Sequence, residues 1–264
     1  MIKIIIISLT PCGRGLGEGK NCFNEGIYEM KNHGILNLDR IVFIGRTFDE
    51  YMRFFDLDQS ILTQGSVLDC AAGPSSFTAE ANRLGFKVTA CDILYRLSLD
   101  TLTEKGREDI EHVFQKVDGV PHLYVWKYYK DRKEIIALRH KALDLFSQDF
   151  SARLAEGRYV HAEIPRLPFA DRSFSLVLSS HFLFLYGDKL SVDFHMASLK
   201  EMARVSSGEV RVYPLQGLDA KPYPHMEYVL SRLRSEEIQA EIIPTPFEFQ
   251  RGANKMLRLK TVAK

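Results

Sequence analysis

Short apolar runs alternate with longer amphipathic stretches along most of the chain. Ser66–Cys70 and Lys87–Asp92 are largely apolar runs of strand length. The helical stretch Phe77–Leu84 lies between them and ends at Gly85, a favourable C-terminal cap. Residues 71–76, which are small, join the first run to the helix. The pattern predicts a β-turn-α-β unit whose strands end at one edge of a sheet.

The same alternation continues toward the C-terminus. Further strands are predicted at Tyr159–Ile164, Phe174–Ser180, Glu209–Leu215, Ile238–Ile243 and Met256–Val262. Helices are predicted at Ser191–Val205 and Met226–Glu237. Strands that alternate with helices indicate an α/β fold with a mostly parallel sheet covered on both faces.

Much more chain separates the second predicted strand from the third than a crossover needs. A crossover takes roughly a dozen residues plus a helix, whereas residues 95–157 form a long, charge-rich and mainly helical stretch. We predict a helical insertion here. Its aromatic residues are expected to pack, with a substrate lid as the alternative role for Tyr128 and Tyr129 beside Lys127 and Lys130.

The N-terminal 40 residues differ from the rest. Gly13–Lys20 is glycine-rich and follows the apolar run Ile2–Ile7, which superficially suggests a nucleotide loop, but Asn21 replaces the metal-binding Ser or Thr of that motif. We interpret residues 1–40 as a flexible leader and residues 41–264 as one domain. No stretch is long enough to span a membrane, and a cytoplasmic protein is expected.

Composition narrows the classes of ligand. Lys plus Arg total 35 against 34 acidic residues, a formal net charge of +1, so the basic surplus typical of nucleic-acid proteins is missing. The cysteines form no pair or cluster with metal-ligand spacing, and no metal is predicted. Cys70 and Cys91 fall in predicted strands and are expected to be buried, in a reducing cytosol.

The run Val67-Leu68-Asp69 followed by Gly73 resembles the first motif of class I S-adenosylmethionine-dependent methyltransferases. In that family an acid ends the first strand, and a Gly-x-Gly-x-Gly loop lets the backbone approach the methionine part of the cofactor. Here Ala71 and Ser75 replace the outer glycines. The resemblance implies a cofactor loop made by Asp69, Ala71, Gly73, Ser75 and Ser76.

Two further acids stand where this family binds the cofactor. Asp92 ends the second strand, where the resemblance implies paired acceptors for the ribose hydroxyls, and Ile93 would pack on the adenine face. Glu163, followed by Ile164, precedes a Leu-Pro-Phe segment common among small-molecule methyltransferases, and is expected to accept from the adenine amino group. The alternatives are helix caps for Asp69 and Asp92, and an ordinary exposed acid for Glu163.

Residues before the first strand and after the fourth complete the expected site. Thr47 and Glu50 form a capping box for a helix that would close over the cofactor, with Arg46 meeting its methionine carboxylate and Tyr51 lining the pocket. Ser180 is expected at the cofactor. His181 would act as general base toward the acceptor, or merely shape the pocket wall. A surface position is the alternative for Arg46.

The resemblance covers roughly residues 65–215. It implies a Rossmann-like three-layer sandwich with a mostly parallel seven-stranded sheet, an antiparallel last strand and the insertion after the second strand. It further implies in-line methyl transfer from S-adenosyl-L-methionine to an acceptor, with a small molecule favoured over RNA or protein. Two rivals stay open: a nicotinamide-dependent dehydrogenase, and a non-catalytic binding module with this fold.

Overall fold

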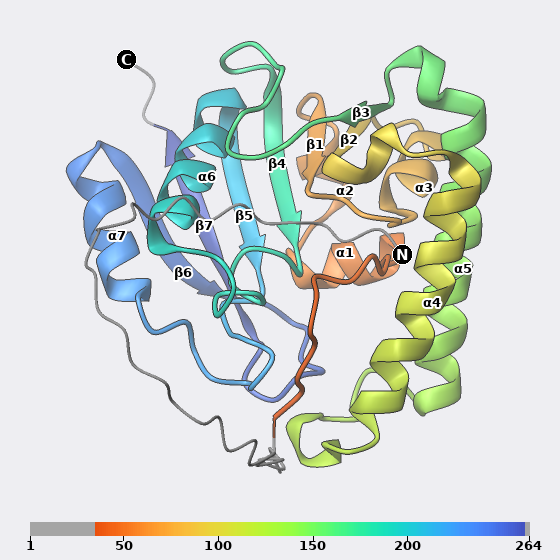
Figure 1. Ribbon diagram of the computed structural model, residues 1–264. Helices are drawn as coiled ribbons and strands as arrows, with labels where there is room; N and C mark the ends of the chain where they lie inside the picture. The colour runs from red at the N-terminus through yellow and green to blue at the C-terminus, as the bar shows by residue number, and fades with distance from the viewer. Residues whose placement is uncertain (1–34, 262–264) are drawn as a thin grey trace, which may run out of the picture. The chain divides into compact units, whose positions relative to one another are not determined.

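Seven strands form a single sheet in the order β3-β2-β1-β4-β5-β7-β6 (Figure 1). The structure is a computed structural model that describes residues 35–261, which belong to one compact unit. The strands are β1 (Val67–Cys70), β2 (Val88–Asp92), β3 (Tyr159–His161), β4 (Phe174–Ser180), β5 (Ser206–Tyr213), β6 (Ile238–Pro244) and β7 (Lys255–Thr261). β7 runs antiparallel to both of its neighbours, β5 and β6, and the other neighbouring pairs are parallel.

The central strands are apolar on both sides because helices cover both faces of the sheet. All four residues of β1 are buried. Successive residues point to opposite faces. Val67 therefore packs with the core on one side and Leu68 with the core on the other.

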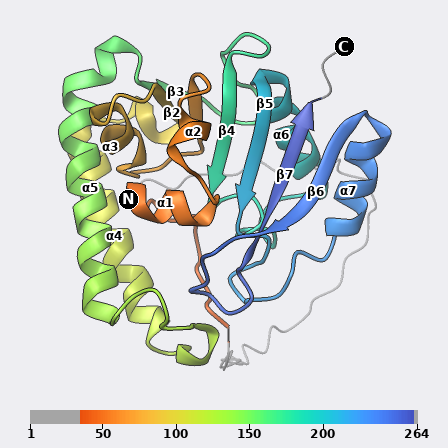
Figure 2. The ribbon, with the colours of Figure 1, turned by 180° about the vertical axis from the view of Figure 1, so that it is seen from behind.

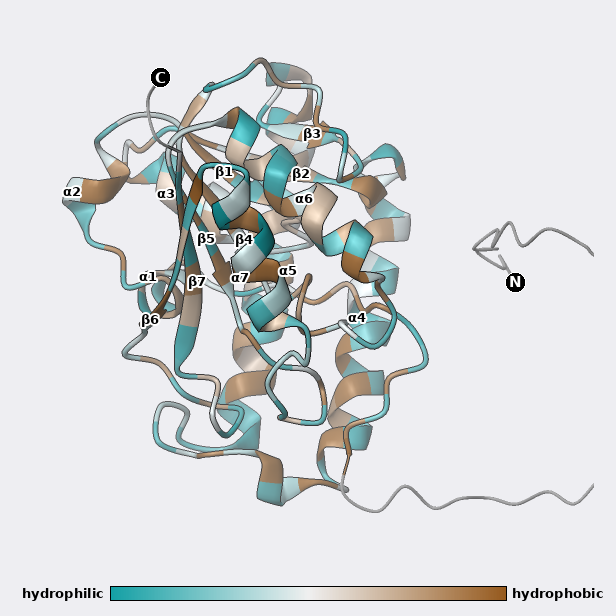
Figure 3. Ribbon diagram, turned by 90° about the vertical axis from the view of Figure 1, so that its left-hand side faces the viewer, coloured by the Kyte–Doolittle hydropathy of each residue, from teal (hydrophilic) through white to brown (hydrophobic). Residues whose placement is uncertain are grey.

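Helices form the two outer layers, and their bounds follow the amphipathic stretches of the sequence. They are α1 (Phe48–Phe54), α2 (Gln59–Leu62), α3 (Phe77–Arg83), α4 (Leu99–Val117), α5 (Arg132–Arg153), α6 (Val192–Val205) and α7 (Met226–Ser235), with single turns η1 (Ile93–Arg96), η2 (Pro121–Leu123) and η3 (Leu154–Glu156). Helices α6 and α7 cover one face, and α3 to α5 pack on the other side (Figures 1 and 2). Figure 3 shows mixed hydrophilic and hydrophobic bands along these helices.

The expected insertion is a pair of long helices, α4 and α5, packed side by side at the β3 edge of the sheet (Figure 1). A buried carboxylate, Asp109 of α4, fastens the preceding N-terminal segment to it. Asp109 accepts hydrogen bonds from the Arg40 guanidinium at 2.8 Å and from the Phe43 amide at 2.7 Å. This segment is thereby held against the insertion and next to the carboxyl ends of the strands.

The predicted fold class is confirmed in strand number, strand directions and the place of the insertion. Two strand limits differ from the predicted ones by three residues. β3 ends at His161, since the chain then turns and Glu163 bridges to Arg166. β5 begins at Ser206, before the predicted Glu209, because Ser206 pairs with Phe174 of β4.

The expected leader lies almost wholly outside the described residues, including Gly13–Lys20. Leu36 and Leu38, at its end, are buried in the core. Cys70 and Cys91 are buried free thiols, as predicted. Between residues 35 and 261, no helix combines the length and apolarity needed to cross a membrane.

Candidate active site

The expected site residues gather at the carboxyl edge of the parallel strands. β1 lies in the middle of the sheet, with β2 on one side and β4 on the other, so the chain leaves the sheet in opposite directions from this point. Ligands of open α/β sheets bind in the crevice that such a switch point creates. The residues after β1, β2, β3 and β4 are the ones that the sequence singled out.

The loop after β1 is a tight turn shaped by small residues. Gly73 has φ +56°, a left-handed conformation that glycine adopts without strain, and a Cβ there would have only the Phe43 ring near it, at 3.9 Å. Gly45 passes so close that a Cβ on it would lie 2.0 Å from the Pro74 carbonyl oxygen. The neighbouring Arg46 amide donates to the Ser75 hydroxyl at 3.1 Å. The preceding segment is therefore docked against this loop.

Asp92, at the end of β2, closes onto the same loop. Its carboxylate accepts from the backbone amides of Gly73 and Leu94, each at 2.9 Å, and burial raises its pKa. The Leu94 bond caps η1, so the alternative role of a helix cap is also met. A carboxylate offers about four acceptor positions, which leaves about two for a vicinal diol.

The residues that follow β2 and β3 border Asp92. The Ala162 amide donates to the Asp92 carbonyl oxygen at 3.2 Å, so the chain that carries Glu163 and Ile164 starts beside Asp92. Glu163 is exposed, and Ile93 is 41% exposed. An apolar side chain and a free carboxylate are thus available next to the ribose position that the resemblance implies.

Asp69 is fully buried and is not a helix cap. Ser76 is the N-cap residue of α3 and no side chain makes the capping bond, which removes the capping alternative for Asp69. Instead Tyr51 donates to its Oδ1 at 3.0 Å, and the Tyr51 hydroxyl also lies 3.2 Å from the Ser75 hydroxyl. Asp69 Oδ2 has no hydrogen-bond partner. Burial, together with the nearby Asp92 charge, raises the pKa of Asp69 to about 8.

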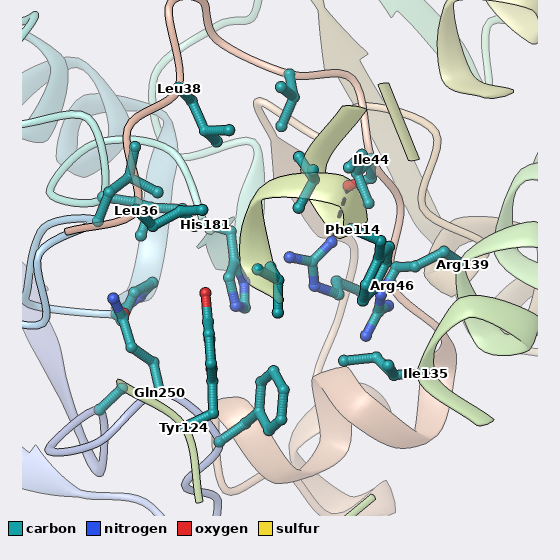
Figure 4. Close-up of a pocket in the computed structure, with 18 of the residues that line it drawn as sticks. Leu36, Leu38, Ile44, Arg46, Phe114, Tyr124, Ile135, Arg139, His181 and Gln250 are labelled. Carbon is teal, nitrogen blue, oxygen red and sulfur yellow. Dashed lines mark hydrogen bonds between the residues drawn. The ribbon is translucent and has the colours of Figure 1, made fainter. Parts of the chain in front are cut away.

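A pocket of about 120 Å³ opens beside this cluster, at the ends of β4 and β5 (Figure 4). Its walls come from the segment before α1, the insertion, the strand ends and the loop between β6 and β7. Residues from these four parts include Leu36, Leu38, Ile44 and Arg46; Phe114, Tyr124, Tyr129 and Arg139; His181 and Tyr213; and Phe247 and Gln250. The pocket is mostly apolar with a few polar groups, the usual character of a small-molecule site.

His181 joins the pocket to the buried cluster. Its Nδ1 lies 2.8 Å from the Ser180 hydroxyl, and Ser180 also opposes the rise that burial causes in the pKa of Tyr51. The ring packs against Phe54 and Tyr213, with centroids 4.9 and 5.4 Å away. Burial, then the charges of Arg46 and Arg139, lower the pKa of His181 well below 6.5. The neutral ring has a lone pair that can accept a proton, but the same burial and charges make it a weaker base than a free imidazole.

We expect the His181 ring to stay neutral between pH 6 and 8. Because a charged imidazole would face two guanidiniums in a buried position, protonation is disfavoured throughout this range. The measurement is a pH series of ring carbon and proton NMR shifts, assigned with His181→Gln. The exposed His140 serves as the control ring in the same spectra. A His181 midpoint near 6.5 would contradict the electrostatic description of the pocket.

Two arginines at the pocket differ in how they are paired. Arg139 donates to Glu50 with both terminal nitrogens, at 2.8 Å to Oε2 for Nη1, and to the Gly45 carbonyl oxygen at 2.9 Å. Tyr129 also donates to Glu50. Arg46 bonds no carboxylate among the described residues; its Nη1 donates to the carbonyl oxygens of Ile44 and Gly45, each at 3.1 Å.

The structure brings the predicted residues into two adjoining groups. Asp69, Ser75, Tyr51 and Ser180 form the buried cluster, with Asp92 nearby across the loop. The Arg46 side chain lies in the pocket with His181, while its backbone contacts the loop. Of the expected lid residues, Tyr129 lines the pocket, and Tyr128 instead packs against Phe247 with ring centroids 4.9 Å apart.

Several pocket residues escaped the sequence analysis. Glu50, which lies behind the pocket wall and binds Arg139, was noticed only as a capping residue. Arg139 and Gln250 carry no local signal, since they reach the pocket only through tertiary folding. Within residues 35–261 no group of three or more His, Cys, Asp or Glu side chains is arranged to hold a metal ion.

The strand order, the antiparallel β7 and the loop after β1 define the class: the chain has the fold of class I S-adenosylmethionine-dependent methyltransferases. No family model matches the sequence. The chain is 31% identical to "Uncharacterized protein MJ0045" of Methanocaldococcus jannaschii over 226 residues, which are 85% of this chain and 98% of that protein. It belongs to the same family as that protein.

Solved methyltransferase structures give partial superpositions. A SAM-dependent methyltransferase from Aquifex aeolicus is 14% identical, with 81% of this chain and 93% of that chain covered, at a TM-score of 0.40. Magnesium protoporphyrin IX methyltransferase from Synechocystis with bound SAM is 11% identical, with coverages of 81% and 78%, at a TM-score of 0.42. Scores of this size add no argument, and the fold assignment rests on the strand order and directions.

Proposed function

We propose that this protein binds S-adenosyl-L-methionine at the carboxyl ends of β1 to β3 and transfers its methyl group to a small molecule held in the adjoining pocket. The observation that carries the proposal is that the buried cluster around Asp69 and the pocket that contains His181 adjoin each other. Tyr51 donates to Asp69 and lies 3.2 Å from the Ser75 hydroxyl on the loop side. On the pocket side, Ser180 opposes the rise that burial causes in the pKa of Tyr51, and its hydroxyl lies 2.8 Å from His181 Nδ1. A donor and an acceptor bound in these two places would be neighbours.

The residues present fit the cofactor. Gly73 leaves open space where a side chain would stand, Asp92 keeps acceptor capacity for a diol, and Asp69 has a buried oxygen without a partner. We infer that Asp92 holds the ribose hydroxyls, that Ile93 and Ile164 flank the adenine, and that Glu163 accepts from its amino group. Ala71, Ser75 and Ser76 would shape the methionine end. Ala71 and Ser75 are the departures from the glycine motif.

When bound, S-adenosyl-L-methionine supplies an electrophilic methyl group with a good leaving group. The protein's own contribution is then mainly positioning, which can lower a barrier by roughly 7–11 kcal/mol. The apolar pocket walls exclude water from the acceptor. His181, neutral and held by Ser180, would accept the proton that an oxygen or nitrogen acceptor loses. A pocket of about 120 Å³ favours a small acceptor over RNA or protein. We place this reaction in the cytoplasm.

The test is calorimetric titration with S-adenosyl-L-methionine, in parallel with Asp92→Ala and Glu163→Ala. We expect micromolar binding by the unchanged protein and at least about a tenfold loss for Asp92→Ala, because hydrogen bonds to a charged group are each worth about 1.5–3 kcal/mol. Glu163→Ala should weaken binding less, and since Glu163 is exposed it should leave the fold intact.

Asp144→Ala, an exposed acid on α5, is the matched control and should bind like the unchanged protein. Melting curves establish that each variant is folded. NADH titrated into the unchanged protein tests the dehydrogenase alternative. No binding of S-adenosyl-L-methionine would end the methyltransferase proposal, and NADH binding in its place would favour the dehydrogenase.

A further inference from the structure

The pocket carries an uncompensated positive charge. Arg46 and Arg139 are the charged residues on its walls, and none of the described residues that line it is Asp or Glu. Glu50 lies behind the wall and is engaged by Arg139 and Tyr129. Two guanidiniums thus share one carboxylate, and His181 adds a neutral ring.

Arg46 is the group with bonding capacity left. Its Nη1 binds two backbone carbonyl oxygens at 3.1 Å, and no described residue accepts from its Nε or Nη2. Burial and the nearby Arg139 charge lower its pKa to about 10, so it stays charged at neutral pH. In Figure 4 its side chain points into the same space as His181. A half-buried cation without a bonded anion leaves bonding capacity that an anionic ligand could fill.

The other residues of the pocket wall indicate the size and polarity of the rest of the ligand. Leu36, Leu38 and Phe249 are apolar, and Tyr124 brings a hydroxyl across from His181. An apolar cavity of about 150 Å³ holds a benzene ring. The present pocket, of about 120 Å³, is of similar size. An aromatic or compact aliphatic body with one anionic group matches both its shape and its charge.

We propose that Arg46 forms an anion subsite and that the ligand of this pocket is a small aromatic or aliphatic carboxylate. Arg46 binds the carboxylate through its free guanidinium edge, and Arg139 adds long-range attraction. This inference rests on the proposed function in naming the ligand as the methyl acceptor; the anion subsite itself does not depend on methyl transfer. It differs from the role first expected for Arg46, in which the same guanidinium meets the cofactor's methionine carboxylate.

The experiment compares benzoate with benzamide, a neutral molecule of nearly the same shape, by ligand-observed NMR titration of the full chain. Benzoate should bind the unchanged protein about 10- to 100-fold more tightly than benzamide, as expected for hydrogen bonds to charged groups. Arg46→Gln should remove most of the preference and leave only the small part that Arg139 supplies, and Arg46→Lys should keep a larger part. Arg53→Gln, an exposed arginine on α1, is the matched control and should keep all of it.

The unchanged protein needs no variant to test the idea: equal affinities for benzoate and benzamide would overturn it. A preference that survives undiminished in Arg46→Gln would also overturn it. A tenfold loss of S-adenosyl-L-methionine affinity in Arg46→Gln, with the benzoate preference intact, would assign the guanidinium to the cofactor carboxylate instead. Benzoate selectivity that depends on Arg46 in a protein that fails to bind S-adenosyl-L-methionine would support the subsite while removing the methyltransferase proposal.

Discussion

Glu50→Gln is expected to lower the free energy of unfolding by about 3–5 kcal/mol, the usual cost of removing one partner from a buried ion pair. Glu50 is fully buried, and it accepts from Arg139, Tyr129 and the Thr47 amide. The amide of Gln keeps the shape but leaves the Arg139 charge without a partner. For a chain of this size the loss corresponds to a melting temperature lower by roughly 10 °C.

The measurement is guanidinium unfolding together with thermal melting. Glu104→Gln, an exposed position on α4, is the matched control and should change stability by less than about 0.5 kcal/mol. In the double variant Glu50→Gln with Arg139→Met, the uncompensated charge is gone, so much of the loss should be recovered. A loss below about 1 kcal/mol for Glu50→Gln alone would mean that Arg139 finds another partner or water.

The stabilisation by the Glu50–Arg139 ion pair is lost at low pH. Burial raises the pKa of Glu50, but the charge and hydrogen bond of Arg139 outweigh this effect and lower the pKa to about 2. Because the folded pKa lies below the unfolded one, the contribution to stability is complete above about pH 4.5 and disappears as the pH falls through 2. Between pH 2 and pH 4.5, the free energy of unfolding should therefore depend less on pH in Glu50→Gln than in the unchanged protein.

The fold could be predicted because its elements are encoded locally. Fully buried parallel strands are continuous apolar runs, as at β1 and β4, and caps mark the helices, as Thr47 and Ser191 do. β3 was predicted too long because the apolar Ala162 and Ile164 pack in the core without strand pairing. Burial and strand pairing are separate properties, and apolarity reports only the first.

The site could be predicted only where the chain itself brings residues together. The loop after β1 and the acid after β2 follow their strands directly, so strand order alone places Gly73 beside Asp92. Glu50 and Arg139 are 89 positions apart in the sequence. Nothing local distinguishes Arg139 from the other charged residues of α5, and its role depends on where the insertion packs against the N-terminal segment. The positive charge of the pocket could therefore not be predicted from a composition whose net charge is only +1.

Asp69 should make cofactor affinity depend on pH. Its pKa of about 8 means that the carboxyl is largely protonated at pH 6, and its Oδ2 has no partner to satisfy. We expect the positively charged amino group at the methionine end of the cofactor to need the ionised form. The ionised fraction of Asp69 rises with pH while a free α-amino group loses its proton near pH 7.7–8.0. Affinity should therefore peak near pH 8, about 20-fold above its value at pH 6.

The measurement is calorimetric titration with S-adenosylhomocysteine, the demethylated cofactor, at pH values from 6 to 9. Below pH 8 the binding heat should change with the ionisation enthalpy of the buffer, because binding releases the Asp69 proton. Asp69→Asn keeps the oxygen that accepts from Tyr51 and mimics the protonated acid. It should therefore bind the cofactor weakly, and its affinity should not rise between pH 6 and pH 8. Affinity that stays flat from pH 6 to 8 in the unchanged protein would show that Asp69 does not meet the amino group.

Stability of the protein without cofactor gives an independent check on the same residue. A folded pKa above the unfolded value of an acid means that folding favours the protonated form, so the contribution to stability declines as the pH rises from about 4 to 8. Asp69→Asn, which cannot ionise, should melt at a higher temperature than the unchanged protein at pH 9 and at nearly the same temperature at pH 4. If the two proteins melt alike at both pH values, the buried carboxyl is already ionised with a partner, and the pH dependence of cofactor binding must arise elsewhere.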